Sequence, residues 1–579
     1  MVKLKEKHYL FLVCLLAFLA RVLIIPQVQV VDADATSRIF IAEGLLDHFR
    51  LLYEGVWLPL HYYLIAISIF ITGEHFYGPM LLHSLLAVLT AIPIYFFTKR
   101  ELNPKGALFA SAIYLFIPVV FRNSFHALAG IPCAFFVAHG INLLSKGLKA
   151  NDLKLTALAG LMMTLAGGFR YESWVLIAIF TGILLFKKSW QHLFTFWVIS
   201  VFFPAFWMIG NYIAHQDFFY GLSGAYYWNI IKEGVNDHVS FNEKILRIIF
   251  FPLSWAFNYS PIIVTLLAYV VYLKRKVMQK HSNPLLWLTP FIVMLLIFIV
   301  KSYEGTLLMQ HRFSISLVLL SVPFSSYLFS IPISNRKGKI IAILLVVSLS
   351  PLSYFWLKLP IERLIPSFKV KSWVSNFRYR ATYGFEAIPQ LANPVYREHA
   401  ERLKQSLGTQ DGLIIDFTSW EETYFLALYS GLKNDQIYLA DGAMHNEVKH
   451  RALEQVLKNY DQGIILLVCN SSFSKTYQIN NNILTFNRFP DLHLKLELIS
   501  SDYSSSIFTY NKTTETMGHS ENSVDCPEPN SLAHYIGKIY RHPVFLNEAK
   551  KKAAKEEITL LEAIQLNAKR MQIDDQERN

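Results

Sequence analysis

Long apolar runs separated by short polar turns dominate the first 357 residues of the chain. A helix of about 20 apolar residues crosses the core of a bilayer. Runs of roughly this kind number about eleven and occupy residues 8–25, 76–98, 104–121, 128–145, 155–168, 172–186, 191–213, 251–273, 284–300, 312–331 and 340–357. The apolar segment 60–73 is shorter and indicates an interfacial or re-entrant helix. We therefore expect residues 1–357 to form an all-α, multi-span membrane domain.

Basic residues cluster in every second turn between these runs, which predicts the orientation in the membrane. The clusters contain Lys3, Lys5, Lys7, Lys99, Arg100, Lys105, Lys146, Lys149, Lys154, Lys187, Lys188, Lys274, Arg275, Lys276, Lys280, Arg336, Lys337 and Lys339. Lysine and arginine accumulate in cytoplasmic loops. We expect a cytoplasmic N-terminus and an integral, multi-pass location in the plasma (inner) membrane. The loops 26–75, 122–127, 169–171, 214–250 and 301–311, and all residues beyond 357, are then extracytoplasmic, which includes the periplasm.

Residues 358–515 follow a different pattern, in which short apolar runs alternate with helical ones. Residues 412–417, 436–441 and 463–470 predict buried strands, and 421–432 and 446–460 predict the helices between them. This alternation indicates an α/β domain with parallel strands. Residues 516–579 predict a linker and a charged helical tail. The sequence has no GxGxxG motif, so no nucleotide site is predicted.

Composition agrees with a membrane protein, because 53% of the residues are hydrophobic and only 17% are charged. The formal net charge of +12 permits a nucleic-acid partner in principle. The basic residues lie in turns between apolar runs, so we assign the excess to membrane topology and expect no nucleic acid. The four cysteines show neither zinc-ligand spacing nor a disulfide framework, although a single Cys469–Cys526 bond stays open.

Two carboxylates, Asp32 and Asp34, lie close behind the first apolar run. Carboxylates near lipid are costly to hold and are usually functional. One of them could accept a proton from an attacking hydroxyl group. The pair could instead bind a divalent cation such as Mg²⁺ or Mn²⁺, and no other cofactor is predicted. The structural alternative is that Asp34 caps a helix over residues 36–49.

Aromatic and basic residues in the other outer loops are candidates for substrate binding. Trp57 and His61 could line a groove for a sugar or a polyprenyl chain, although an interfacial aromatic belt gives the same pattern. In the third outer loop, Arg170 could grip a phosphate through its planar guanidinium. Tyr171 and Glu172 follow it, and Glu172 could bind a metal or a substrate hydroxyl, or simply pair with Arg170.

The fifth outer loop contributes Glu304, His311 and Arg312. Arg312 is a cation on the outer side, against the usual charge distribution. A lipid-linked phosphate is a suitable partner for it, and snorkelling toward phospholipid is the alternative. Separate outer loops thus deliver carboxylates, arginines, histidines and aromatic rings to one face of the membrane.

Three segments carry a resemblance to a known superfamily: Asp34-Ala-Thr-Ser-Arg38, Gly55-Val-Trp57-Leu-Pro59-Leu and Phe169-Arg170-Tyr171-Glu172-Ser-Trp174. They resemble the GT-C integral-membrane glycosyltransferases, in particular the family 39-like, phospholipid-carrier-dependent branch. Protein O-mannosyltransferases and lipid A aminoarabinose transferases are relatives of that branch. The resemblance covers roughly residues 8–330.

The resemblance implies a multi-span GT-C core and a polyprenyl-phosphate sugar donor, with transfer that inverts the anomeric centre. It implies that Asp34 is the base, that Asp32 assists or binds metal, and that Arg38 belongs to the same motif. Arg170 and Arg312 would contact the donor phosphate. Many relatives carry an acidic residue in the second outer loop, where this chain has no carboxylate between 122 and 130.

The sequence therefore predicts an enzyme that moves a hexosyl or pentosyl group from a polyprenyl-phosphate donor to an extracytoplasmic glycan, lipid or protein. A lipid or polysaccharide transporter or flippase is the first alternative, but it predicts polar residues at mid-membrane. A non-catalytic membrane scaffold acting through residues 358–579 is the second.

Overall fold

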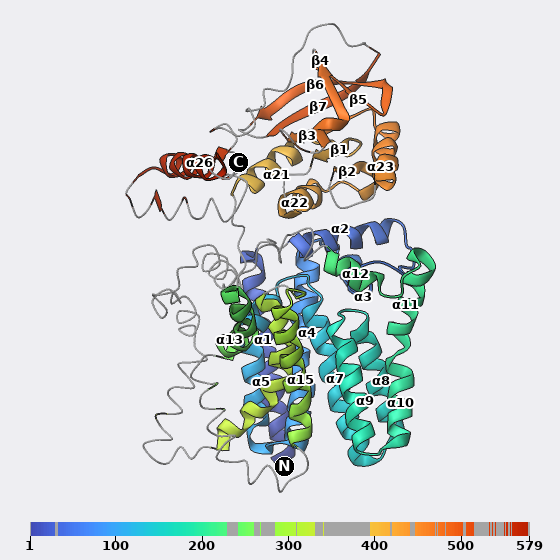
Figure 1. Cartoon of the computed structure of the whole chain (residues 1–579), viewed down its shortest axis with the longest axis vertical. Helices are drawn as coiled ribbons and strands as arrows, with labels where there is room; N and C mark the ends of the chain where they lie inside the picture. Colours follow the sequence, from blue (N-terminus) through green and yellow to red (C-terminus); the bar gives the residue numbers. More distant parts are fainter. Residues whose placement is uncertain are drawn as a thin grey trace. The chain divides into compact units, whose positions relative to one another are not determined.

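The structure is a computed structural model (Figure 1). It describes residues 2–28, 33–227, 241–259, 284–307, 310–330, 394–416, 420–440, 446–468, 473–480, 482–501, 505–514 and 558–576, and isolated residues between these ranges. The predicted span 340–357, most of 251–273 and residue Asp32 lie outside them. The chain forms two compact units. The helical unit comprises Met1–Val28 and Arg50–Pro389, and the sheet unit comprises Gln29–Phe49 and Gln390–Asn579.

The described part of the helical unit is entirely helical between its turns. Its helices are α1 (Val2–Ile24), α3 (Leu60–Thr72), α4 (Tyr77–Glu101), α5 (Ala107–Phe116), α6 (Pro118–Asn123), α7 (Gly130–Ala150), α8 (Leu153–Gly167), α9 (Glu172–Phe186), α10 (Trp190–Ser200), α11 (Phe202–His215), α12 (Tyr220–Tyr226), α13 (Phe241–Tyr259), α15 (Pro284–Tyr303) and α16 (Ile315–Ser321). Short 3-10 turns occur at η1 (Ile25–Gln27), η2 (Pro104–Gly106), η4 (His311–Ser314) and η5 (Val322–Ser330).

Four helical stretches among the described residues are long and apolar enough to cross a membrane: Glu6–Ile24, Tyr77–Glu101, Gly130–Ala150 and Trp190–His215. Shorter apolar helices account for other predicted spans, so the count of eleven stays a prediction. The run 104–121 shows why the count changes. Pro118 forces Ile117 into an extended conformation, which ends α5 and starts the separate helix α6.

Small residues let the central helices approach closely. Gly140 on α7 and Gly160 on α8 face neighbouring helices where a Cβ atom would meet Met163 and Phe196 at 3.0 Å or less. Close approach at small residues is the usual way helices associate in a membrane. Large apolar side chains such as Phe70, Phe186 and Phe202 are instead exposed on the outside of the unit. A lipid-facing surface accounts for that exposure, and the chain is an integral membrane protein.

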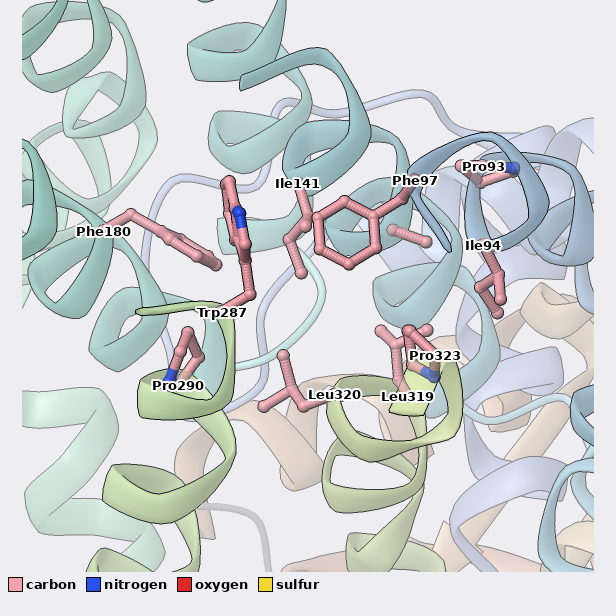
Figure 2. Close-up of a pocket in the computed structure, with 11 residues that line it drawn as sticks. Pro93, Ile94, Phe97, Ile141, Phe180, Trp287, Pro290, Leu319, Leu320 and Pro323 are labelled. Atoms are coloured by element: carbon pink, nitrogen blue, oxygen red, sulfur yellow. The ribbon is translucent and has the colours of Figure 1, made fainter. Parts of the chain in front are cut away.

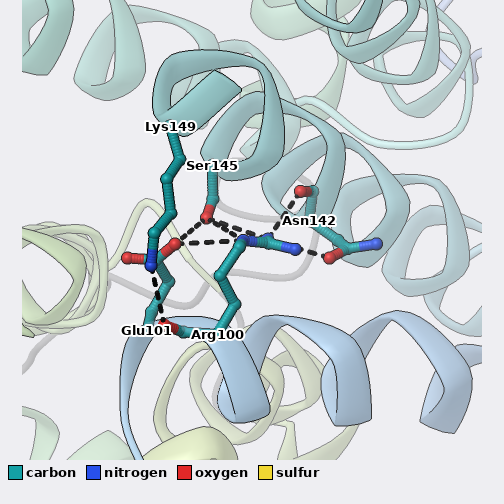
Figure 3. A network of polar contacts seen from close by, with 5 residues as sticks. All are labelled: Arg100, Glu101, Asn142, Ser145 and Lys149. Carbon is teal, nitrogen blue, oxygen red and sulfur yellow. Dashed lines mark hydrogen bonds and ion pairs between the residues drawn. The ribbon is translucent and has the colours of Figure 1, made fainter. Parts of the chain in front are cut away.

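At one end of the helical unit, which is basic, polar contacts join α4 to α7 (Figure 3). The Arg100 guanidinium at the end of α4 donates to the Asn142 carbonyl oxygen at 2.8 Å and to Ser145 Oγ at 2.8 Å, both on α7. It also pairs with Glu101 at 3.0 Å. The Arg100 guanidinium thus bonds to oxygen atoms of the protein. These bonds hold the ends of the two long helices α4 and α7 against each other.

Between the two ends, the prolines of α4, α15 and η5 line a small apolar cavity (Figure 2). Pro93 and Pro290 interrupt the helical hydrogen bonding of α4 and α15, and Pro323 lies opposite them. Phe97 and Trp287 close the cavity with an edge-to-face contact of 5.0 Å. No charged side chain lines it, so it contributes no acid, base or phosphate ligand.

The sheet unit contains a seven-stranded sheet in the order β2-β1-β3-β7-β6-β5-β4. Its strands are β1 (Gly412–Asp416), β2 (Ile437–Ala440), β3 (Gln462–Val468), β4 (Tyr477–Asn480), β5 (Ile483–Phe486), β6 (Phe489–Ser501) and β7 (Ser505–Thr513). The three predicted strands are confirmed and pair in parallel. The antiparallel strands β4 to β7 were not predicted, and they extend the sheet from β3 through β7.

The helices of the sheet unit are α2 (Ala33–Asp47), α21 (Pro394–Ser406), α22 (Trp420–Ser430), α23 (Asn446–Asn459) and α26 (Leu560–Gln576), with the turns η6 (Asn434–Gln436) and η7 (Phe473–Thr476). Helices α22 and α23 confirm the two helices expected between the strands. Helix α2 comes from the first predicted outer loop, yet it packs on α22 and η6. This segment therefore folds with the C-terminal domain.

Replacing Gly106 by Ala tests the close contact between η2 and η5. A Cβ atom at Gly106 would overlap the main-chain carbonyl oxygen of Ser326, which has no flexible group to move aside. We expect Gly106→Ala to destabilise the protein by about 1–3 kcal/mol, measured as a lower unfolding temperature in detergent. Gly182→Ala on α9 meets nothing within 4 Å and is the matched control. Equal unfolding temperatures for the two variants would contradict this packing.

Candidate functional site

The turn between α8 and α9 holds the predicted residues Arg170, Tyr171 and Glu172 and is fastened to the loop before α3. The Tyr171 hydroxyl donates to the Val56 carbonyl oxygen at 2.9 Å and accepts from Trp207 Nε1 at 3.2 Å. Burial raises the pKa of Tyr171 to about 12, so its hydroxyl stays protonated. Tyr171 thus anchors the turn, and both hydrogen-bonding functions of its hydroxyl are already used.

Arg170 and Arg312, far apart in the sequence, meet at one aromatic ring. The Arg170 guanidinium lies 4.9 Å from the centroid of the Phe313 ring, and the Arg312 guanidinium lies 5.8 Å from the same centroid. A cation over an aromatic face is stabilised by the ring's electron density. Phe313 therefore holds the guanidinium groups of Arg170 and Arg312 close together.

Glu172 is the acid within this group. Arg170 Nε donates to both Glu172 carboxylate oxygens at 3.1 Å, and the two side chains are 16% and 17% exposed. Glu172 also opens α9, where the helix dipole favours a negative charge. The pair that the sequence suggested is thus present, and it orients the Arg170 guanidinium.

Helix α6 and the loop that follows it add a buried arginine and a buried histidine. Arg122 is 5% exposed and His126 is 4% exposed. Burial lowers the pKa of His126 well below its ordinary value, and the charges of Arg122, Arg312 and His83 lower it further. His126 is therefore a neutral imidazole among cations. It lies close enough to Arg312 for the charge of that residue to affect its pKa.

Two fully buried histidines join the same end of the unit. His61 Nε2 lies 3.0 Å from His83 Nε2, and His83 Nδ1 lies 2.7 Å from the Pro79 carbonyl oxygen. A carbonyl oxygen only accepts, so Nδ1 of His83 carries a proton, and one of the two Nε2 atoms donates to the other. The His61 ring also packs edge-on against Phe169, at 6.4 Å between centroids. The pair connects α3 and α4 to the α8–α9 turn.

We call the set Arg122, Arg170, Arg312, His61, His83 and His126 the basic cluster. It lies at the starts of α4, α7 and α9, whose other ends carry Arg100, Lys149 and Lys187. Glu172 pairs with Arg170 of this cluster. Guanidinium groups of this kind bind phosphate oxygens in pairs. Among the described residues, no group of three or more His, Cys, Asp or Glu could hold a metal ion.

The remaining predicted residues lie elsewhere. Trp57 is partly exposed in the loop before α3. Glu304 is exposed after α15 and bonds to Lys301 and Thr306, each at 3.4 Å. Asp34 and Arg38 lie on α2 of the sheet unit. The side chain of His311, in η4, and all of Asp32 are outside the described residues.

Four residues of this site were not predicted as site residues from the sequence, namely His83, Arg122, His126 and Phe313. His83 sits inside the apolar run 76–98, and an ionisable residue within a span is itself a functional signal. Phe313 directly follows Arg312, but nothing in the sequence shows that its ring also reaches Arg170.

Comparison with known proteins identifies related families and folds. Residues 58–209 match the family model of dolichyl-phosphate-mannose-protein mannosyltransferases. No curated protein sequence matches the chain. The fold is similar to that of ArnT from Cupriavidus metallidurans bound to undecaprenyl phosphate, with a TM-score of 0.56, 13% identity, and coverage of 86% of this chain and 97% of that one.

The apo form of the same ArnT gives a TM-score of 0.56 at 12% identity over 88% of this chain and 98% of that one. An oligosaccharyltransferase from Archaeoglobus fulgidus is a looser match, with a TM-score of 0.45, 11% identity, and coverage of 79% and 67%. The chain thus has the GT-C fold. Its resemblance to the GT-C glycosyltransferases related to O-mannosyltransferases and aminoarabinose transferases is confirmed.

His126 gives the site a measurable pH signature. Its folded pKa lies below the unfolded one, so below about pH 6.5 the unfolded chain binds a proton that the folded chain does not. This one group then lowers the stability by up to about 1.4 kcal/mol per pH unit as the pH falls. We expect His126→Gln to flatten the decline of unfolding temperature between pH 6.5 and 5.

The exposed His48 supplies the control for this measurement. His48→Gln should keep the slope of the wild-type protein. A His126→Gln variant with the wild-type slope would show that His126 is protonated in the folded protein.

Proposed function

We propose that this chain is a membrane glycosyltransferase that moves a sugar from a polyprenyl-phosphate-linked donor to an extracytoplasmic glycan, lipid or protein, with inversion at the anomeric carbon. The end of the helical unit that carries the basic cluster then faces the extracytoplasmic side, and the lysine-rich ends face the cytoplasm. The sheet unit is extracytoplasmic in this proposal, and the N-terminus is cytoplasmic.

The observation that carries the proposal is that Arg170 and Arg312 meet at Phe313, with guanidinium groups 4.9 Å and 5.8 Å from its ring centroid. Two neighbouring guanidinium groups can bind a ligand that has several anionic oxygens and is held at the membrane surface. A lipid-linked phosphate has both properties, because its chain stays in the bilayer. The neutral His126 beside the arginines adds hydrogen-bonding capacity without further charge.

The donor class is supported by the solved structure with the same fold, the Cupriavidus metallidurans ArnT bound to undecaprenyl phosphate. The matched family is described by its use of dolichyl-phosphate-mannose. Both ligands are long prenyl chains that end in a phosphate. We therefore propose the same class of carrier for this chain, with the sugar and the acceptor left to experiment.

Asp34 is the base in the proposed reaction. It opens α2 and is half-buried. Its carboxylate takes the proton from an acceptor hydroxyl, whose oxygen forms a bond to the anomeric carbon. The bond from that carbon to the phosphate oxygen breaks, and the polyprenyl phosphate leaves with the electron pair. Arg170 and Arg312 stabilise the charge that grows on the leaving phosphate. A divalent cation held by Asp32 and Asp34 would also stabilise the charge on the leaving phosphate.

Asp34→Asn tests the base directly. The amide keeps the size of the side chain but accepts no proton, so the transferred sugar should fall by about 10²–10⁴-fold. The measurement is mass spectrometry of surface glycans, glycolipids and envelope glycoproteins from a deletion strain that carries each variant.

Asp47→Asn, at the other end of the same helix, is the matched control and should restore the wild-type profile. A lost sugar in the deletion strain identifies the reaction. Full transfer by Asp34→Asn would remove Asp34 from the role of base, and an unaltered glycome in the deletion strain would favour a transporter or a scaffold.

Phe313→Leu tests the arrangement of the two arginines. Leucine fills similar space but has no aromatic face, so both cation–π contacts are lost, at roughly 0.5–1 kcal/mol each. We expect the affinity of the purified protein for undecaprenyl phosphate to fall by about 5–30-fold. Phe186→Leu, at the exposed opposite end of α9, should bind normally. Equal affinities for these two variants would contradict the proposed phosphate site.

A further inference from the structure

We infer that the sheet unit positions the proposed base. It does so by docking helix α2 through Phe40 and Gly44, so that Asp34 is carried on a helix held by the C-terminal domain. This inference rests on the proposed function of Asp34. It gives a definite task to the domain, namely to hold one catalytic carboxylate in place.

The docking contacts join residues almost four hundred positions apart. Asn434 Nδ2, in η6, donates to the Phe40 carbonyl oxygen at 2.9 Å. The Phe40 ring meets the Tyr424 ring of α22 edge-to-face, with centroids 5.8 Å apart. Phe40 also packs against the buried core that lies between α21, α22 and the parallel strands. Both polar and apolar contacts of Phe40 therefore tie the helix to the domain.

Gly44 makes this approach possible. A Cβ atom at position 44 would lie 2.5 Å from Asn434 Nδ2, which is closer than such atoms come in proteins. Phe40 and Gly44 are one helical turn apart, so they share a face of α2. We call this the docking face of α2. A larger residue at 44 would push Asn434 away and break the hydrogen bond to Phe40.

Asp34 lies on a different face. Successive residues of an α-helix are about 100° apart, which places Asp34 about 120° and Arg38 about 160° around the axis from Phe40. The docking face is thus turned toward the domain, and Asp34 lies to the side of it, about 80° around the axis from Gly44. A rotation or displacement of α2 on the domain would move the Asp34 carboxylate directly.

The helix needs this support for a physical reason. It has 15 residues and includes Thr36, Ser37 and Gly44, which are weak helix formers. Isolated helices of this length are marginal in water. The hydrogen bond from Asn434 and the packing of Phe40 therefore supply order that the helix does not possess by itself. Catalysis by a carboxylate depends on such order, because a misplacement of about 1 Å costs roughly a hundredfold in rate.

The test uses full-length Asn434→Ala and Phe40→Ala proteins in detergent and in the deletion strain. We expect hydrogen exchange of the α2 amides to rise at least tenfold in both variants. We expect the transferred sugar to fall at least tenfold. Binding of undecaprenyl phosphate should stay unchanged, because the basic cluster lies in the helical unit. A general failure to fold would abolish this binding as well, so the readout separates positioning from folding.

Lys512→Ala is the matched control. It removes a 2.6 Å contact between Lys512 on β7 and Asp461, in the same domain but on neither α22 nor η6, the elements that pack on α2. It should leave exchange and product as in the wild type. The double variant Gly44→Cys and Asn434→Cys provides a rescue. Copper-phenanthroline oxidises the two thiols to a disulfide, which replaces the lost hydrogen bond, and we expect the oxidised protein to regain product that the reduced protein lacks.

Normal product from Asn434→Ala and Phe40→Ala, despite faster exchange in α2, would overturn the positioning role and leave the glycosyltransferase proposal intact. Unchanged exchange in α2 would overturn the docking itself. A wild-type protein that transfers no sugar would remove the proposed function, and the inference with it, while the exchange data would still report on docking.

Discussion

Charged groups inside an apolar helix bundle have to be satisfied by the protein, since lipid offers them nothing, and the rest of the helical unit follows from this constraint. Arg21 is fully buried and donates to Ser124 Oγ at 3.0 Å, to the Leu115 carbonyl oxygen at 2.6 Å and to the Ala17 carbonyl oxygen at 3.0 Å. These bonds tie α1 to α5 and to Ser124 at the end of α6, which lies between Arg122 and His126. A cation in the first helix thus shapes the loop beside the candidate site.

The same constraint separates the two ends of the unit by their chemistry. At one end, Arg100 and its partners form a closed network in which each cation meets an oxygen atom (Figure 3). At the other end, Arg170 and Arg312 share the Phe313 ring, and Arg170 pairs with Glu172. The first arrangement stabilises helix ends, whereas the second is suited to a ligand. The apolar cavity between them has no part in the chemistry (Figure 2).

The proposed reaction divides its groups between two folded units. The arginines proposed to bind the phosphate belong to the helical unit, and the proposed base belongs to α2 of the sheet unit. Leaving-group stabilisation and proton removal then depend on different sets of packing contacts. A variant in one unit should therefore change one of these steps while it spares the other, which is the basis for separating donor binding from transfer.

Several features were readable from the sequence because they depend on neighbours along the chain. Apolar runs predicted the helices, alternation predicted β1, β2, β3 and the helices between them, and Arg170 with Glu172 were recognisable as a local pair. Tertiary structure alone decided that Phe313 joins Arg170 to Arg312, that His61 bonds to His83, and that α2 folds with a domain beginning near residue 390. These contacts join residues 22 to almost 400 positions apart, and no local propensity or periodicity records which distant side chains will share one ring or one hydrogen bond.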